Sequence, residues 1–132
     1  ETSSSESTQT EFVDKVVVGS FSARLYWGYS RSITDARNSA NIFVYRGKKT
    51  IGDHAYQGFT AIERNSYATV YLDGEVINLV KVQQSWGYND GNLKFEDGTI
   101  VTAENSPGEF TMYTCNSSHM SNGVTITFWS RR

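Results

Sequence analysis

Apolar and polar residues alternate through most of this chain, and a period of two is the pattern of a β-strand. In the segment SARLYWGY, Ala23, Leu25 and Trp27 fall on one face, whereas Arg24 and Tyr26 fall on the other. Apolar residues spaced by three and four positions, which would indicate amphipathic helices, are almost absent. The chain is therefore expected to be mainly β-structure.

Turn signals divide the chain into about eight short strands. Asp73-Gly74 and Asp97-Gly98 stand at the centres of two predicted hairpins, YATVYLDGEVINLVKVQQ and LKFEDGTIVTAE. The polar segments GKKTIGDHAYQG and SWGYNDGN are predicted to be loops, and FTAIERN a short helical turn. Short strands joined by frequent turns favour a closed barrel or a sandwich.

The first eleven residues, ETSSSESTQTE, include no apolar side chain. Such a segment cannot offset the entropy lost on ordering, so we expect residues 1–11 to be a disordered tether and residues 12–132 to form one β-domain. Polar tethers of this kind typically come directly after a removed signal, a lipoprotein anchor or a membrane helix. We therefore expect a secreted or surface-anchored protein that meets a membrane only through such an N-terminal anchor.

Charge and cysteine content exclude several other classes. The net charge is −2 and no basic block is present, so nucleic-acid binding has no electrostatic support. No run reaches the roughly 18 apolar residues that a membrane helix needs. The single cysteine rules out an internal disulfide.

That cysteine, Cys115, ends the alternating segment EFTMYTC, in which Thr111, Tyr113 and Cys115 share one face. A lone cysteine is commonly a small buried hydrophobe. It acts as a nucleophile only as a thiolate, which requires a base such as His54 or His119. Cys115, His54 and His119 would form only a weak metal-binding pattern, so neither a metal nor a cofactor is predicted.

Two segments resemble the sortase family. The run TMYTC, residues 111–115, is similar to the sortase signature Thr-Leu-x-Thr-Cys, with methionine in place of leucine. The segment IGDHAYQGF resembles the sortase histidine segment, with a glycine close before the histidine and an aromatic residue after it. His54 precedes Cys115 by 61 residues and a last strand comes after the cysteine, as in sortases. The resemblance covers roughly residues 12 to 130.

The resemblance implies a closed eight-stranded β-barrel with short helical insertions, and a cysteine transpeptidase on a Gram-positive cell surface. Cys115 would be the nucleophile that forms a thioacyl enzyme. His54 would be the general acid for the leaving amine and the base for the incoming one. The substrates would be a sorting-signal peptide of a surface protein or pilin and an amine of peptidoglycan or of a pilin. Asp53, directly before His54, is a candidate for orienting its ring or tuning its pKa.

Sortases also carry an arginine early in the strand after the cysteine loop, where it stabilises the oxyanion. Here those positions hold Gly123, Val124 and Thr125. Arg131 comes seven residues after Val124, which is roughly 23 Å along a strand, so the register predicts it at the opposite end of the barrel. Arg37, in the polar insertion DARNSA, is therefore our first candidate for the donor, ahead of Arg131.

Aromatic and histidine side chains near these motifs are candidates for contacting substrate: Tyr113, Tyr56, Trp27, Trp86 and His119. The same residues leave two other hypotheses open. One is a surface binding module of the adhesin or lectin type on a β-scaffold. The other is a sortase-like fold that no longer catalyses a reaction.

Overall fold

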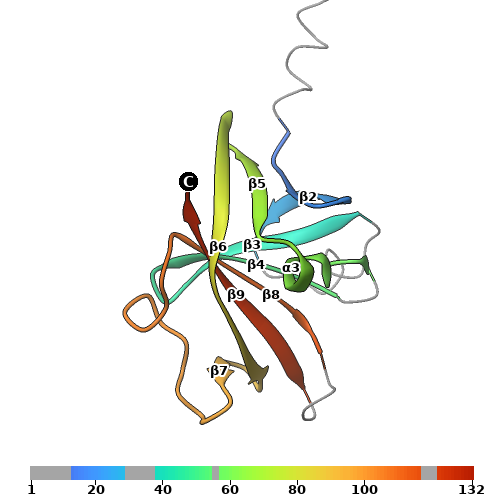
Figure 1. The fold of residues 1–132 in the computed structure, drawn as a ribbon. Helices are drawn as coiled ribbons and strands as arrows, with labels where there is room; N and C mark the ends of the chain where they lie inside the picture. Colours follow the sequence, from blue (N-terminus) through green and yellow to red (C-terminus); the bar gives the residue numbers. More distant parts are fainter. Residues whose placement is uncertain (1–12, 29–37, 55–56, 117–121) are drawn as a thin grey trace, which may run out of the picture.

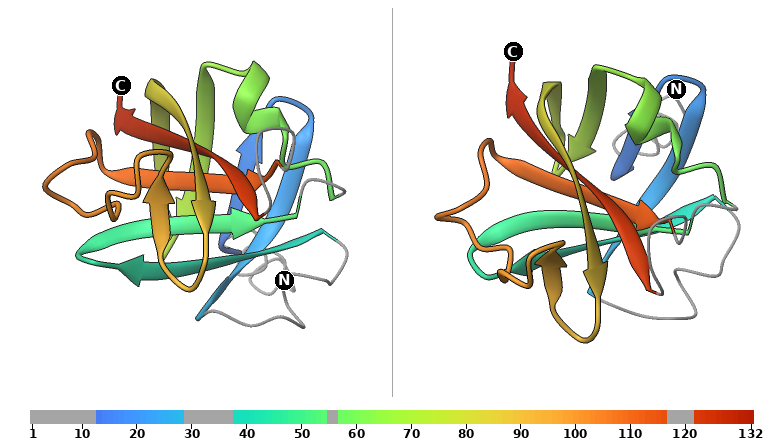
Figure 2. Two further views of the ribbon diagram at one scale, coloured as in Figure 1. Left: turned by 90° about the horizontal axis from the view of Figure 1, so that it is seen from below. Right: turned by 60° about the horizontal axis from the view of Figure 1, so that its bottom comes forward.

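The computed structural model describes residues 13–28, 38–54, 57–116 and 122–132. Within these ranges, eight strands close into a barrel in the order β5-β1-β2-β3-β4-β8-β9-β6, and β5 pairs with β6 to complete the ring (Figures 1 and 2). They are β1 (Lys15–Val18), β2 (Phe21–Trp27), β3 (Ser39–Tyr45), β4 (Lys48–Asp53), β5 (Tyr67–Leu72), β6 (Glu75–Asn89), β8 (Phe110–Cys115) and β9 (Gly123–Arg131). The predicted all-β barrel is confirmed, and the sandwich is excluded.

Turn chemistry explains the first predicted hairpin. Asp73 and Gly74, between β5 and β6, both have positive φ angles, as a tight two-residue turn requires. The second predicted hairpin is only partly formed. Strand β7 (Leu93–Phe95) pairs with β6 outside the ring, and the returning chain adds a single bridge, from Lys94 to Ile100.

Two segments that were predicted to be loops are partly strands, because their polar residues have partners in the fold. Lys48 begins β4 and is only 6% exposed, and its ammonium group donates hydrogen bonds to the carbonyl oxygens of Ser106 and Pro107. Similarly, β6 continues through Ser85–Asn89, since residues 85–88 of this segment pair with the first half of β9.

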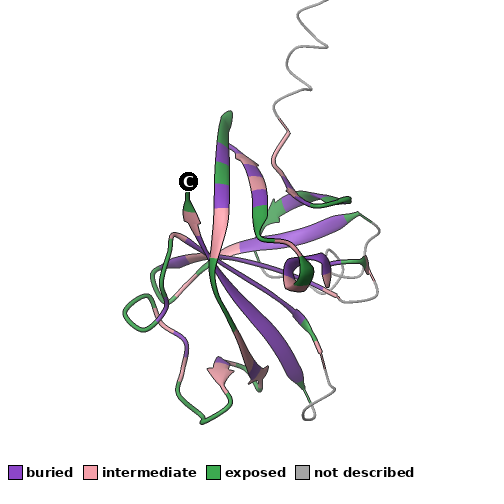
Figure 3. Ribbon diagram, in the orientation of Figure 1, coloured by how far each residue is buried: buried purple, intermediate pink, exposed green. Residues whose placement is uncertain are grey.

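The core consists of two apolar clusters on the two sides of β8 and β9. Phe110 and Met112 belong to the cluster inside the barrel, whereas Tyr113 belongs to an outer cluster with Leu93, Val101, Val124, Ile126 and Phe128. The outer cluster is partly covered by β7. For this reason β8 is buried on both faces until Cys115, and β9 until Trp129 (Figure 3).

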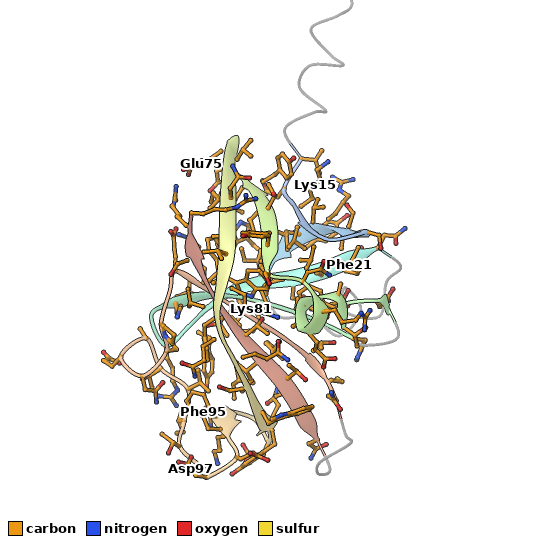
Figure 4. All side chains as sticks on the ribbon, in the orientation of Figure 1. Lys15, Phe21, Glu75, Lys81, Phe95 and Asp97 are labelled. Atoms are coloured by element: carbon orange, nitrogen blue, oxygen red, sulfur yellow. The ribbon has the colours of Figure 1, made fainter. Side chains whose placement is uncertain are left out.

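The predicted helical turn is the short helix α3 (Ala61–Arg64), which contributes Ala61 and Ile62 to the inner cluster. Lys81 on β6 donates hydrogen bonds to the carbonyl oxygens of Ile62 and Glu63, at 2.9 and 3.2 Å (Figure 4). These bonds satisfy carbonyl groups that a helix this short leaves unpaired, and they fix α3 against the barrel. None of the helices in the described ranges is long and apolar enough to span a bilayer.

Strand β7 depends on the absence of a side chain at Gly87. A Cβ atom there would lie 2.0 Å from the carbonyl oxygen of Lys94 and 2.8 Å from Ile126. We expect Gly87→Ala to destabilise the protein by about 2 kcal/mol or more, because backbone and core must both shift. Urea unfolding measures the effect. Gly91→Ala, with φ of +111° but open space, is the control for strain alone. A Gly87→Ala variant no less stable than Gly91→Ala would contradict this expectation.

Candidate active site

Cys115 is the last residue of β8 and its side chain is exposed. It shares its strand face with Thr111 and Tyr113, which places it on the outer side of the barrel wall. Among the residues of β8 it is the first to leave the buried region, because the outer cluster covers the strand only as far as Tyr113. Cys115 is therefore exposed where β8 ends.

His54 comes directly after β4, the parallel neighbour of β8. The last pair of this ladder joins Asp53 to Thr114, so the next residues of the two strands, His54 and Cys115, emerge side by side. The distance from Cys115 Sγ to His54 Nδ1 is 3.8 Å. This separation is within the range of a sulfur hydrogen bond, and it gives the thiol a neighbouring base.

Gly52, two residues before His54, is needed for close packing beside this pair. A Cβ atom at position 52 would lie 2.6 Å from the ring of Tyr113, its partner on β8. The tyrosine ring therefore lies across the backbone of β4. The sequence suggests that Gly52 is a loop residue, but in the structure it is a strand residue whose missing side chain makes room for the Tyr113 ring.

Asp53 points to the opposite side of β4 and is only 4% exposed. Its Oδ1 atom accepts a hydrogen bond from the backbone N–H of His54 at 2.8 Å. Burial raises the pKa of the Asp53 carboxyl group to about 7, and the bond from His54 N–H acts in the opposite direction. Within the described residues, Asp53 Oδ2 and Thr114 Oγ1 are buried without a hydrogen-bond partner.

The raised pKa of Asp53 predicts a pH-dependent cost to folding. In the unfolded chain this carboxyl group ionises near 3.8, whereas in the folded state it keeps its proton up to a pH of about 7. The folded protein therefore loses stability as the pH rises between these values. We expect Asp53→Asn to gain on the order of 2 kcal/mol over the wild type between pH 4.5 and pH 8, a figure discounted for partial solvation.

Urea unfolding at the two pH values tests this expectation. Asp97→Asn is the control: the backbone N–H of Thr99 lowers the pKa of that exposed carboxyl group below 3.8, so both pH values lie above its titration and this variant should respond to pH as the wild type does. If the Asp53→Asn variant and the wild type responded equally to pH, the carboxyl group of Asp53 would not carry the cost.

A second acidic side chain, Glu63, contacts the residue that comes directly after Cys115, and the sequence did not indicate it. Glu63 Oε2, on α3, accepts hydrogen bonds from Asn116 Nδ2 at 2.9 Å and Thr125 Oγ1 at 2.5 Å. Asn116 Nδ2 also lies 3.2 Å from Thr125 Oγ1. These contacts join α3 to the residue directly after Cys115. They also occupy the side-chain amide of Asn116.

The position directly opposite Cys115 on β9 is Val124. Arg131 lies at the other end of β9, where its guanidinium group pairs with Glu75 and Glu109 at 2.7 Å each. Arg131 therefore lies far from the thiol, at the opposite end of the barrel, where the strand register predicted it. Arg37 lies outside the described residues.

Three of the candidates for contacting substrate lie in the described ranges. Tyr113 is buried in the outer cluster, and Trp86 on β6 is partly exposed. Trp27 is 48% exposed at the end of β2. Tyr56 and His119 lie outside the described residues. In the part of the chain that the structure describes, no three His, Cys, Asp or Glu side chains form a group that could hold a metal ion.

Two of the cavities that the described residues line adjoin the barrel. One, of about 170 Å³, lies on the face of β8 that carries Cys115 and is lined by Phe43, Tyr45, Thr50, Asn89, Gly91, Leu93 and Tyr113. The other, of about 640 Å³, is a wide depression between β1, β2 and α3. Cys115 and His54 line neither cavity, but the smaller one includes Tyr113, which shares a strand face with Cys115.

Comparisons with known proteins show what the fold is similar to. No family model and no curated protein matches the sequence. Among solved structures, sortase C1 from Streptococcus agalactiae matches with a TM-score of 0.65 and 14% identity, over 90% of this chain and 66% of that one. Sortase C from Streptococcus pneumoniae matches with a TM-score of 0.63 and 14% identity, over 91% of this chain and 68% of that one.

Sortase C from Clostridium perfringens, in a structure with the C-terminal cell wall sorting motif, matches with a TM-score of 0.62 and 12% identity. That match covers 89% of this chain and 69% of the other. At identities this low the similarity concerns the fold and not individual residues. The chain described here has a sortase-like fold.

Proposed function

We propose that this protein is a sortase-like cysteine transpeptidase, with Cys115 as the nucleophile and His54 as the general acid and base. The observation that carries the proposal is the 3.8 Å separation of Cys115 Sγ and His54 Nδ1 at an exposed strand end. A thiol beside an imidazole ionises more readily than an isolated thiol, since the imidazolium stabilises the thiolate. A buried structural cysteine would need neither the exposure nor the base.

The two groups supply a complete reaction. The thiolate attacks a peptide carbonyl carbon and forms a C–S bond, and the oxygen takes up the negative charge. Collapse of this intermediate breaks the C–N bond, and His54 donates its proton to the departing amine. An incoming amine then attacks the thioester, His54 accepts its proton, and Cys115 leaves as the thiolate. The proton and the thiolate are both regenerated, and no cofactor is consumed.

The substrate proposed is an extended peptide of the sorting-signal type, from a surface protein or pilin, with an amine of peptidoglycan or a pilin as acceptor. The small cavity beside Tyr113 supports this choice, because its apolar and aromatic lining suits one side chain of a bound peptide. A cell-surface location in a Gram-positive bacterium belongs to the same proposal, as do substrate contacts by Trp27, Trp86, Tyr56 and His119.

A peptidyl trap tests the function directly. A panel of sorting-signal-type peptides carrying a thiol-reactive group at the scissile position is incubated with the protein, and intact mass reports the adduct. We expect one adduct, at Cys115, that depends on the peptide sequence and is absent from Cys115→Ser. Labelling no faster than that of an unstructured peptide thiol, for every peptide in the panel, would overturn the proposal.

A further inference from the structure

The backbone of His54 is held by groups that do not belong to the barrel ladder. The pairing of β4 with β8 ends at Asp53 and Thr114, one residue before the histidine. The N–H of His54 instead donates to Asp53 Oδ1 at 2.8 Å, and its carbonyl oxygen accepts from the N–H of Gln57 at 3.1 Å. Both polar groups of this peptide segment are thereby fixed where the chain leaves the sheet.

The carboxyl group that makes the first of these bonds is an expensive one to bury. Asp53 lies on the inner side of β4 and is only 4% exposed. Among the described residues, no ion pair compensates the group, and its second oxygen, Oδ2, has no hydrogen-bond partner. A buried carboxyl group without a charge partner costs stability, which agrees with the raised pKa of this side chain. The hydrogen bond to His54 is thus the contact that distinguishes Asp53 from an apolar residue at the same place.

The position of the imidazole depends on the position of this backbone. His54 lies beyond the last ladder pair, and its ring is partly exposed, so packing alone does not determine its place. A small rotation about the peptide between Asp53 and His54 would move Nδ1 away from Cys115 Sγ, which is 3.8 Å distant. Proton transfer requires a well-defined donor–acceptor geometry, and displacements of about 1 Å are costly to the rate.

We propose that Asp53 is a positioning residue: its buried carboxyl group holds the backbone N–H of His54 and thereby keeps the imidazole against the sulfur of Cys115. The inference rests on the proposed function for its catalytic consequence, but the geometric claim stands apart from it. Asp53 acts through His54 and does not touch the substrate. An acceptor oxygen is the property required, so asparagine should replace it and alanine should not.

The test compares Asp53→Ala with Asp53→Asn, which keeps an acceptor oxygen at the same distance along the side chain. Thr127→Val is the matched structural control, because it removes a buried bond from a side chain to the backbone carbonyl of Met112 elsewhere in the barrel. The first readout is NMR of the histidine rings. The chain contains only two histidines, so the His54 signals are assigned by comparison with a His119→Gln variant.

In the wild type, alkylation of Cys115 with iodoacetamide should shift the His54 ring signals, because the two groups are adjacent. This response should be lost in Asp53→Ala and kept in Asp53→Asn and Thr127→Val. The second readout is catalytic. With a peptide found by the trap, kcat should fall about tenfold in Asp53→Ala while KM changes less than about twofold, and Asp53→Asn should restore kcat.

The outcomes separate the two proposals. An unchanged ring response in Asp53→Ala would overturn the positioning role, whatever the activity of the wild type. Equal losses in Asp53→Ala and Thr127→Val would also overturn it, since they would indicate general loosening of the barrel. A wild type without peptide turnover, but with a ring response that depends on Asp53, would leave the positioning role supported and count against the transpeptidase.

Discussion

A His54→Ala variant is expected to lose peptide-transfer activity by on the order of 10³-fold in kcat/KM, which is typical for removal of a general acid and base. The reason is that Cys115 would then lack the imidazole whose Nδ1 atom lies 3.8 Å from its sulfur. At pH 7 an isolated thiol is mostly protonated, with a pKa of about 8.5 in model peptides. The thiolate would be scarcer, and the leaving amine would depart without its proton.

Two rates test this prediction. One is the turnover of a peptide substrate whose sequence the trap experiment has identified, and the other is the alkylation of Cys115 by iodoacetamide at pH 7. Cys115→Ala sets the floor for turnover. Added imidazole should restore part of the turnover in His54→Ala, because a small base can occupy the space that the side chain leaves. If His54→Ala alkylated as fast as the wild type, the imidazole would not activate the thiol.

The sequence predicted a mainly β-fold because its strands alternate strongly and its turns carry recognisable residues, whereas the choice of a closed barrel over a sandwich came from the resemblance to sortases. Asp73-Gly74 is the clearest example, as both residues adopt the positive φ angles that the pair indicates. The prediction was wrong where polar residues are buried with partners far away in the chain. Lys48 made β4 look like a loop, yet its ammonium group is satisfied by residues 106 and 107. A single strand carries no sign of such distant acceptors.

The candidate site divides in the same way. The sequence singled out Cys115 and His54 by the segments TMYTC and IGDHAYQGF and by their order and spacing, and the parallel pairing of β4 with β8 explains why the two side chains lie close together. The contacts of Glu63 with Asn116 and of Gln57 with His54 could not be predicted, because only closure of the barrel brings α3 and the turn before it next to the ends of β4 and β8. Asp53 was visible as a neighbour of His54, but its contact is with the backbone and not with the ring.

Val124, whose side chain has no polar group, is the most informative position for testing the proposed catalysis. Val124 lies directly opposite Cys115 across the antiparallel pair of β8 and β9, and it belongs to the outer cluster on the same side as Tyr113. Directly opposed residues place their Cβ atoms about 5 Å apart. A donor at position 124 would therefore lie within reach of the oxyanion that the proposed reaction forms next to the sulfur, whereas Arg131 is engaged with two carboxylates at the far end of the strand.

We expect Val124→Arg to raise kcat by about 10-fold to 100-fold, because one charged donor at an oxyanion is commonly worth that much or more. Stability should fall at the same time, since Val124 is only 3% exposed and the new side chain must turn outward past Cys115. Val124→Met is the control for size, and Val124→Lys for charge without the planar fork of arginine. The measurement is single-turnover formation of the thioacyl enzyme, which isolates the step in which the oxyanion appears.

The comparison among these variants decides whether the wild-type site, with valine at position 124, has an oxyanion donor elsewhere. If only Val124→Arg accelerates the step, the wild-type site lacks an oxyanion donor, and the Cys115–His54 pair works below the rate that its geometry permits. If arginine is no faster than methionine, another group already serves, and the polar insertion containing Arg37 becomes the place to look for it. If no variant forms a thioacyl enzyme although Cys115 remains activated towards iodoacetamide, the barrel keeps a reactive thiol for a purpose other than peptide transfer.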